Sequence, residues 1–171
     1  NFSSPLIHNF YLMSDNKFLL KGVLIFSILS LSIAYFIQYV LGHKPCNLCL
    51  IERIPYLSAV ILISLLFVIK RFEVMLSSII LIFFVFGALI SFYHVGIEQG
   101  FFDESLVCNL MNSDMDLSKE QLLKQLENAP ISCKEVTFRF FGLSLATINT
   151  IISIILSGII IKVINNYGKN K

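Results

Sequence analysis

Four cysteines are the residues of this sequence best suited to redox chemistry. Cys46 and Cys49 form a Cys-x-x-Cys motif, and Cys108 and Cys133 lie together in a long polar stretch. Thiolates attack disulfides and electrophiles, so paired cysteines can accept and pass on electrons by exchange. Cysteines kept only for packing would be expected in the apolar runs, because free cysteine buries readily. The first pair stands where a loop enters an apolar run and the second lies in a polar connection, so this placement favours redox chemistry.

The elements that position these cysteines are long apolar runs. The chain has 171 residues, of which 56% are hydrophobic and 14% charged. Since a membrane-spanning helix needs about 20 apolar residues, four such runs predict an all-α membrane protein, a bundle of four transmembrane helices in one domain over residues 1–171. The predicted spans are 18–41, 46–69, 75–93 and 138–163.

Charge distribution predicts the orientation of these spans. Lysines and arginines flank the first span, the turn at Lys70-Arg71 and the end of the fourth, whereas loop 94–137 holds eight acids and three lysines. The positive-inside rule then places both termini in the cytoplasm and the cysteines in the periplasm of a bacterial inner membrane, where disulfides persist. The basic residues are scattered at span ends, so no nucleic-acid partner is expected. Residues 1–12 precede Met13, the expected native start, and carry no functional weight.

The long periplasmic loop contains a helix signal of its own. Ser118 to Gln121 has the pattern of a capping box, an apolar stripe of leucines follows, and Pro130 marks the end. We therefore expect a short amphipathic helix between Cys108 and Cys133. The simplest interpretation is a loop helix that packs on the bundle or the membrane surface.

The first cysteine pair is predicted to lie at the start of the second span. The 15 residues from Pro55 to Ile69 would give about 22 Å of helix, which is too short for a hydrocarbon core of about 30 Å. The helix must begin earlier, with Pro45 at the first helical position and Cys-x-x-Cys in the first turn. The free N–H groups there favour an anion and would lower the thiol pKa in this motif.

Arg53 is predicted one turn below this motif. It follows Cys49 by four residues and so shares its helix face, while Glu52 points about 100° away. A cation at that depth needs water, an anion or a polar ligand, which makes Arg53 a candidate for holding a carbonyl or oxyanion beside Cys49. The alternative is an arginine that extends to the interface. In the fourth span, Asn149 is expected to form an interhelical hydrogen bond.

The segment Lys44–Arg53, with its Lys-Pro-Cys-Asn-Leu-Cys-Leu-Ile-Glu-Arg sequence, resembles the disulfide bond formation protein B (DsbB) family. Tyr93-His94 before Cys108 and the Phe-Phe-Gly-Leu-Ser-Leu sequence at 140–145 extend the likeness over roughly residues 18–163. The resemblance implies an inner-membrane thiol-disulfide oxidoreductase. Such a protein reoxidises a periplasmic thioredoxin-fold dithiol oxidase, similar to DsbA, and passes electrons to a membrane quinone.

The resemblance also implies a role for each cysteine. Cys108 would form the mixed disulfide with the thioredoxin-fold partner, and Cys133 would be its disulfide mate. Cys46 would exchange with Cys133, and Cys49 would contact the quinone as a thiolate.

The same resemblance implies a quinone site beside the motif, for ubiquinone or menaquinone. Arg53 would bind a quinone oxygen. His94 is a second candidate contact, and an interfacial histidine without chemistry is the alternative for it.

Other classes of protein are less consistent with the sequence. A vitamin K epoxide reductase-like enzyme would carry its Cys-x-x-Cys late in the chain, after the loop cysteines. A non-enzymatic four-span protein with two structural disulfides is a further alternative, and it would lose mainly stability if Cys49 were replaced by serine. A four-cysteine zinc site usually has two closely spaced pairs, so no metal is predicted.

Overall fold

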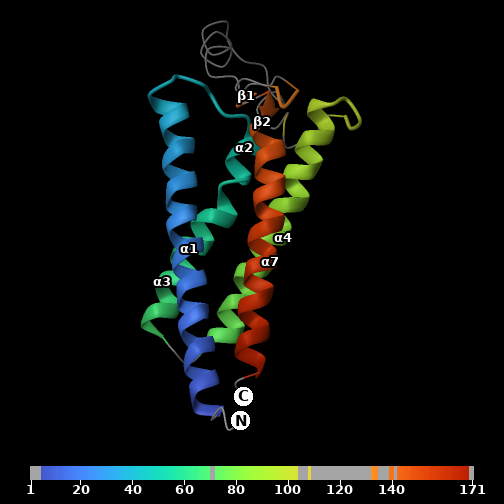
Figure 1. Cartoon of the computed structure of the whole chain (residues 1–171). Helices are drawn as coiled ribbons and strands as arrows, with labels where there is room; N and C mark the ends of the chain where they lie inside the picture. Colours follow the sequence, from blue (N-terminus) through green and yellow to red (C-terminus); the bar gives the residue numbers. More distant parts are fainter. Residues whose placement is uncertain are drawn as a thin grey trace, which may run out of the picture.

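The structure is a computed structural model in which five helices and a short hairpin are described (Figure 1). The described residues are 5–69, 72–103, 108, 132–134, 139–140 and 142–169. The helices are α1 (Pro5–Tyr39), α2 (Asn47–Ile51), α3 (Ile54–Val68), α4 (Glu73–Glu98) and α7 (Leu145–Lys169). The expected amphipathic helix after Ser118 lies outside the described residues.

Among the described residues, four stretches of helix are long and apolar enough to cross a membrane, which confirms the predicted all-α four-span architecture. They are Asp15–Tyr39, Asn47–Val68, Glu73–Glu98 and Leu145–Gly168. The second of them comprises α2 and α3, which are separated by a turn at Glu52 and Arg53. Pro55 stands at the first turn of α3, where its missing N–H costs nothing. The break therefore lies directly below the Cys-x-x-Cys motif.

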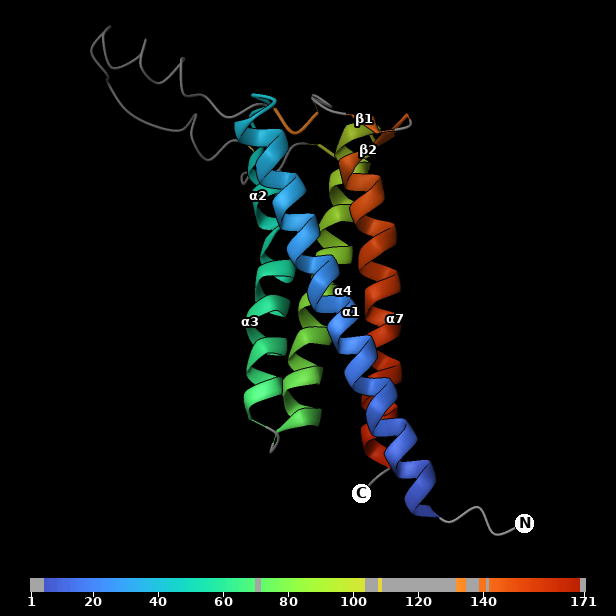
Figure 2. The same ribbon diagram turned by 60° about the vertical axis from the view of Figure 1, so that its left-hand side comes forward.

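The helices form an elongated bundle whose two ends differ. The start of α1, the end of α7, the end of α3 and the start of α4 lie at one end, while α2 and the hairpin lie at the other (Figures 1 and 2). Helix α4 packs on α3 and α7, and α1 packs on α3 and α7. We call the end with α2 the cysteine end.

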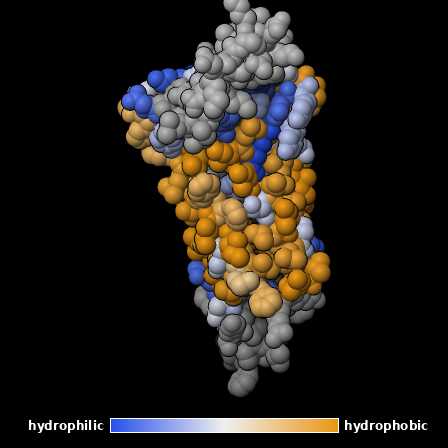
Figure 3. All heavy atoms as spheres, turned by 180° about the vertical axis from the view of Figure 1, so that it is seen from behind, coloured by the Kyte–Doolittle hydropathy of each residue, from blue (hydrophilic) through white to orange (hydrophobic). Residues whose placement is uncertain are grey.

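Large apolar side chains fill the interior and also cover the outside. One fully buried residue from each element meets in the core: Leu20 of α1, Ile63 of α3, Phe84 of α4 and Ile160 of α7. Hydrophobic residues also cover the middle of the outer face in Figure 3, as lipid contact requires. The apolar residues on the outer faces include Phe36, Ile61, Phe92 and Ile154.

Helix α7 is preceded by a two-stranded hairpin. Strands β1 (Arg139–Phe140) and β2 (Leu143–Ser144) pair antiparallel, with Arg139 opposite Ser144. Gly142 in the turn has φ +81°, a conformation that favours glycine. The fourth helix thus begins at Leu145, later than the apolar run suggests, because the residues before it are extended.

Gly87 lets α4 approach α3 closely. A Cβ atom at this position would lie 2.8 Å from Cγ of Pro55, whose rigid ring cannot rotate away. Gly87→Ala should therefore lower the free energy of unfolding by about 1–3 kcal/mol, the usual cost of overpacking. Thermal unfolding in detergent measures this effect. Gly158→Ala on α7, where no atom lies within 4 Å of the new Cβ, is the matched control and should leave stability unchanged or raised.

Candidate functional site

The Cys-x-x-Cys motif lies at the start of α2, as predicted. Cys46 is the N-cap residue, and its Sγ accepts a hydrogen bond from the backbone N–H of Cys49 at 3.3 Å. The two Sγ atoms are 2.8 Å apart, and neither is in a disulfide. Pro45 precedes the cap and is not the first helical residue, so the helix begins two positions later than expected. The cap position brings both sulfurs to one side of the turn.

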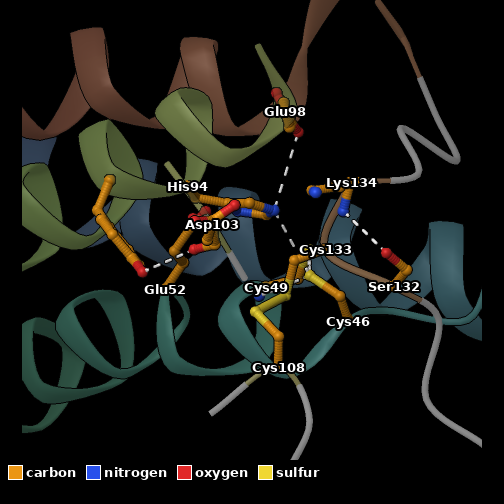
Figure 4. Close-up of a disulfide and its surroundings, with 11 residues drawn as sticks. Cys46, Cys49, Glu52, His94, Glu98, Asp103, Cys108, Ser132, Cys133 and Lys134 are labelled. Carbon is orange, nitrogen blue, oxygen red and sulfur yellow. Dashed lines mark hydrogen bonds and ion pairs between the residues drawn. A yellow bond between two sulfur atoms is a disulfide. The ribbon is translucent and has the colours of Figure 1, made fainter. Parts of the chain in front are cut away.

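The loop cysteines lie beside this motif. Cys108 and Cys133 form a disulfide with their Cα atoms 6.1 Å apart. Both are buried, and Figure 4 shows them close to Cys46. They belong to one apolar cluster with Cys46, Leu48 and Ile97. The structure therefore brings all four predicted cysteines to the same place at the cysteine end.

His94 connects the motif to two acidic side chains. Its ring is buried, with Nδ1 at 2.7 Å from Oε1 of Glu52 and Nε2 at 3.6 Å from Sγ of Cys46 (Figure 4). Oε1 of Glu98 lies 3.9 Å from Nε2. The ring is thus held between a carboxylate and a thiol. The predicted contact of His94 with a quinone stays a prediction.

Glu52 anchors a polar network that links three helices. Its Oε2 accepts from Nδ2 of Asn149 at 3.0 Å, and the same amide nitrogen donates to Oγ of Ser91. The hydroxyl of Tyr56 donates to Oδ1 of Asn149. The interhelical hydrogen bond expected for Asn149 is confirmed. The network fixes the Glu52 carboxylate, and so the tilt of the His94 ring, in an apolar environment where unpaired polar groups are costly.

Sequence reasoning named neither Glu52 nor Glu98 as a site residue. One signal was present, because an ionisable residue inside a span usually has a function. Glu98 also follows His94 by four positions and therefore shares its helix face. The position of Glu52 within the second span and of Glu98 beside His94 therefore indicated that both acids belong to the cysteine end.

Arg53 lies on a groove between α1 and the second span. Its Nη1 donates to Oε1 of Gln38 at 2.6 Å, and its guanidinium carbon lies 5.1 Å from the ring centroid of Tyr35. The groove has a volume of about 300 Å³. The residues that line it are Leu31, Tyr35, Gln38, Tyr39, Leu50, Arg53, Ile54 and Leu57. Most of these side chains are half-exposed or exposed, so the groove is open at the surface of the bundle.

The arginine and the sulfurs are neighbours in sequence, but they do not share one cavity. Cys49 does not line the groove, whereas Leu50, the next residue, does. Cys46, Cys49 and His94 face the buried cluster, and Arg53 faces α1. The site thus has a buried sulfur half and a groove half, separated by the short helix α2.

The environment of Cys46 favours its thiolate. The pKa of its thiol is lowered to about 5, chiefly by the hydrogen bond with the Cys49 thiol. Burial opposes this change, whereas the hydrogen bond with His94 and the charge on its ring lower the pKa further. At neutral pH the reduced pair therefore carries a ready nucleophile.

The lowered pKa predicts how the thiolate responds to pH. In a Cys108→Ser/Cys133→Ser background, the ultraviolet thiolate absorbance of the reduced protein should persist down to a midpoint near pH 5. An ordinary thiol would lose it near pH 8.5. Adding Cys46→Ser should remove the low-pH transition. A midpoint that stays near pH 8.5 would contradict the lowering of the Cys46 pKa by the Cys49 thiol.

The fold and the site together define a class of protein. A four-span bundle with a thiol pair and a disulfide packed together at one end has the architecture of a membrane thiol–disulfide oxidoreductase. The family model described as "Disulfide bond formation protein DsbB" matches residues 16–163, and the chain belongs to this family. Membership in this family supports disulfide oxidoreductase activity over the vitamin K epoxide reductase-like and non-enzymatic alternatives.

The chain is also similar to a protein of a bacterium, but to no solved structure. The chain is 30% identical over 149 residues to the uncharacterized protein RP370 of Rickettsia prowazekii (strain Madrid E). The match covers 85% of this chain and 87% of that protein. No solved structure matches the chain.

Proposed function

We propose that this protein reoxidises a periplasmic thioredoxin-fold dithiol oxidase and passes two electrons to a membrane quinone, either ubiquinone or menaquinone. One observation carries the proposal: the Cys46–Cys49 pair packs against the buried Cys108–Cys133 disulfide, while the next residue, Leu50, lines the groove together with Arg53. A soluble protein partner and a lipid-soluble acceptor must each reach the cysteines by a route of its own. The half of the site with the disulfide would serve the protein partner, and the groove would serve the lipid-soluble acceptor.

Electrons enter at the loop disulfide. A partner thiolate attacks Sγ of Cys108 and releases Cys133 as a thiolate, which attacks Cys46 of an oxidised first pair and releases Cys49. The second partner thiolate then displaces Cys108, and the partner leaves as a disulfide. Cys108 finally attacks Cys133 and releases Cys46, so each step forms one S–S bond and breaks one.

The product of this sequence is a loop disulfide with two thiols at the motif. That is the arrangement seen here, in which Cys108 is bonded to Cys133 while Cys46 and Cys49 are unbonded. The close packing of all four cysteines supports the exchange between the pairs. Little movement is needed for the first pair to close again, because its sulfurs are 2.8 Å apart.

The groove fits the headgroup of a quinone. Its volume is at the lower end of the range for ligand pockets, and its lining is mostly apolar and aromatic. A bound quinone would accept two electrons and two protons. Arg53 would hold a quinone oxygen through its guanidinium, and Gln38 and Tyr35 keep that guanidinium over the groove. Cys49 is the thiol nearest in sequence to this wall, and His94 orients Cys46 behind it.

The orientation follows from the charges and the bundle. The start of α1, the end of α7 and the ends of α3 and α4 that flank the basic pair in the sequence lie at the end opposite the cysteines (Figure 1). Under the positive-inside rule that end is cytoplasmic, so the cysteine end faces the periplasm across a bacterial inner membrane. The disulfide is then in the compartment where it persists and where its partner circulates.

Quinone dependence tests this function directly. Purified protein should oxidise a reduced thioredoxin-fold dithiol protein with multiple turnovers only when a quinone is supplied under anaerobic conditions. Without quinone, partner oxidation should stop once the enzyme's own disulfides are consumed. Unchanged turnover after both quinone and oxygen are removed would exclude the proposed electron route.

A further inference from the structure

We propose that the reduced Cys46–Cys49 pair forms, together with His94 and Glu98, a binding site for one thiophilic divalent cation of the zinc class. This inference needs only a reduced pair, which a chemical reductant provides, so it does not rest on the quinone step. The ligand set also differs from a four-cysteine site, because the loop cysteines take no part. The proposed ligands come from the start of α2 and from the cysteine end of α4.

Three of the ligand atoms already lie together. Sγ of Cys46, Sγ of Cys49 and Nε2 of His94 are all within 4.8 Å of one another. Tetrahedral zinc with ordinary bond lengths separates a sulfur from a nitrogen ligand by about 3.5 Å and two sulfurs by about 3.8 Å. The observed Cys46–His94 distance is 3.6 Å, and the sulfurs, now 2.8 Å apart, would have to separate by about 1 Å. Rotation of the Cys49 side chain would have to provide this separation.

Glu98 supplies a fourth ligand from the same face of α4. Its Oε1 lies 3.9 Å from Nε2 of His94, and its side chain is only 7% exposed (Figure 4). Its other oxygen, Oε2, is buried and has no hydrogen-bond partner among the described residues. A buried carboxylate oxygen without a partner is costly, and a cation relieves that cost. This carboxylate therefore points to a cation independently of the sulfurs.

Glu52 gives His94 the support that metal-binding histidines usually have. Its Oε1 lies 2.7 Å from Nδ1 of His94, which leaves Nε2 directed at the sulfurs. Such a carboxylate–histidine pair fixes the ring and increases its strength as a ligand. Asn149 holds the second oxygen of Glu52, so the support is itself anchored.

The charges in this part of the site also favour a cation. Two sulfur ligands and the carboxylates of Glu52 and Glu98 lie around the His94 imidazole, and Arg53 is turned away to Gln38. Binding would follow Zn²⁺ + 2 RSH → Zn(SR)₂ + 2 H⁺, with no change in oxidation state. Closure of the Cys46–Cys49 disulfide removes both sulfur ligands. The site would thus exist only in the reduced protein and would block thiol exchange while it is occupied.

Cobalt(II) tests the site because its visible spectrum reports tetrahedral sulfur and nitrogen ligands. The full chain in detergent, carrying Cys108→Ser/Cys133→Ser and reduced with a phosphine, should bind one equivalent of Co²⁺, which Zn²⁺ displaces. Oxidation of the remaining pair should abolish the visible bands. If the double variant fails to fold, the fully reduced unmodified chain is compared with Cys46→Ser/Cys49→Ser, which should lack the bands.

The remaining ligands are tested by matched substitutions. His94→Gln and Glu98→Gln should each weaken binding at least about tenfold and change the Co²⁺ spectrum. His43→Gln and Glu73→Gln should change neither, since His43 is not one of the grouped ligand residues and Glu73 lies at the opposite end of α4. Equal binding by Cys46→Ser/Cys49→Ser, or no effect of both ligand variants, would overturn the proposal. A protein that binds Co²⁺ in this way but shows no quinone dependence would refute the proposed function alone.

Discussion

Replacement of Cys49 by serine is expected to reduce quinone-linked turnover by at least about 10³-fold, as removal of a nucleophile does in other enzymes. A hydroxyl cannot form the Cys46–Cys49 disulfide, so electrons could enter the protein but not leave it. Steady-state oxidation of a reduced thioredoxin-fold partner, with quinone in excess, measures the loss. Since Cys49 is not in a disulfide here, thermal stability should change little.

A single-turnover measurement provides the internal control for this variant. Cys49→Ser keeps the Cys108–Cys133 disulfide and should still oxidise about one equivalent of partner before it stops. Normal multiple turnover by Cys49→Ser would show that the motif lies off the electron route. Loss of the first equivalent as well would indicate misfolding.

The sequence predicted those features of the fold that depend on local signals. Hydropathy over about 20 residues identified the four spans, and the distance from Pro55 to Ile69 required the second span to start at the cysteines. The prediction that Pro45 is the first residue of this helix was wrong. Cys46 caps the helix with its own sulfur and so excludes Pro45 from the first turn. A cap made by a cysteine side chain is not a usual sequence signal.

The contacts around the motif could not be predicted in the same way. His94 meets Glu52 across 42 positions and Asn149 meets Glu52 across 97, so these pairs depend on how three helices are rotated against one another. The angular separation of Glu52 from its neighbour Arg53 was predicted. This separation explains why Glu52 points to the buried cluster and Arg53 to the groove. Their partners, His94 on α4 and Gln38 on α1, are determined by how the helices pack.

Arg53→Ala should weaken the apparent affinity for quinone by about 10- to 100-fold, the equivalent of one charge-assisted hydrogen bond of about 1.5–3 kcal/mol. The maximal rate at saturating quinone should fall less, because the cysteines and His94 remain in place. Initial rates over a range of quinone concentrations separate the two effects. Arg53→Lys should recover part of the affinity, since it keeps the charge but loses the planar fork that bonds Gln38.

Two further substitutions identify which interaction of Arg53 matters. Arg139→Ala removes a cation from exposed strand β1, away from the groove lining, and should leave the quinone dependence unaltered. Gln38→Ala removes the hydrogen bond that holds the guanidinium and should raise the apparent KM for quinone less than Arg53→Ala does. If Arg53→Ala and Arg139→Ala behaved alike, the arginine would act only through net charge at the cysteine end. A graded series, with Gln38→Ala between the control and Arg53→Ala, would instead mean that the groove recognises quinone through a guanidinium positioned by α1.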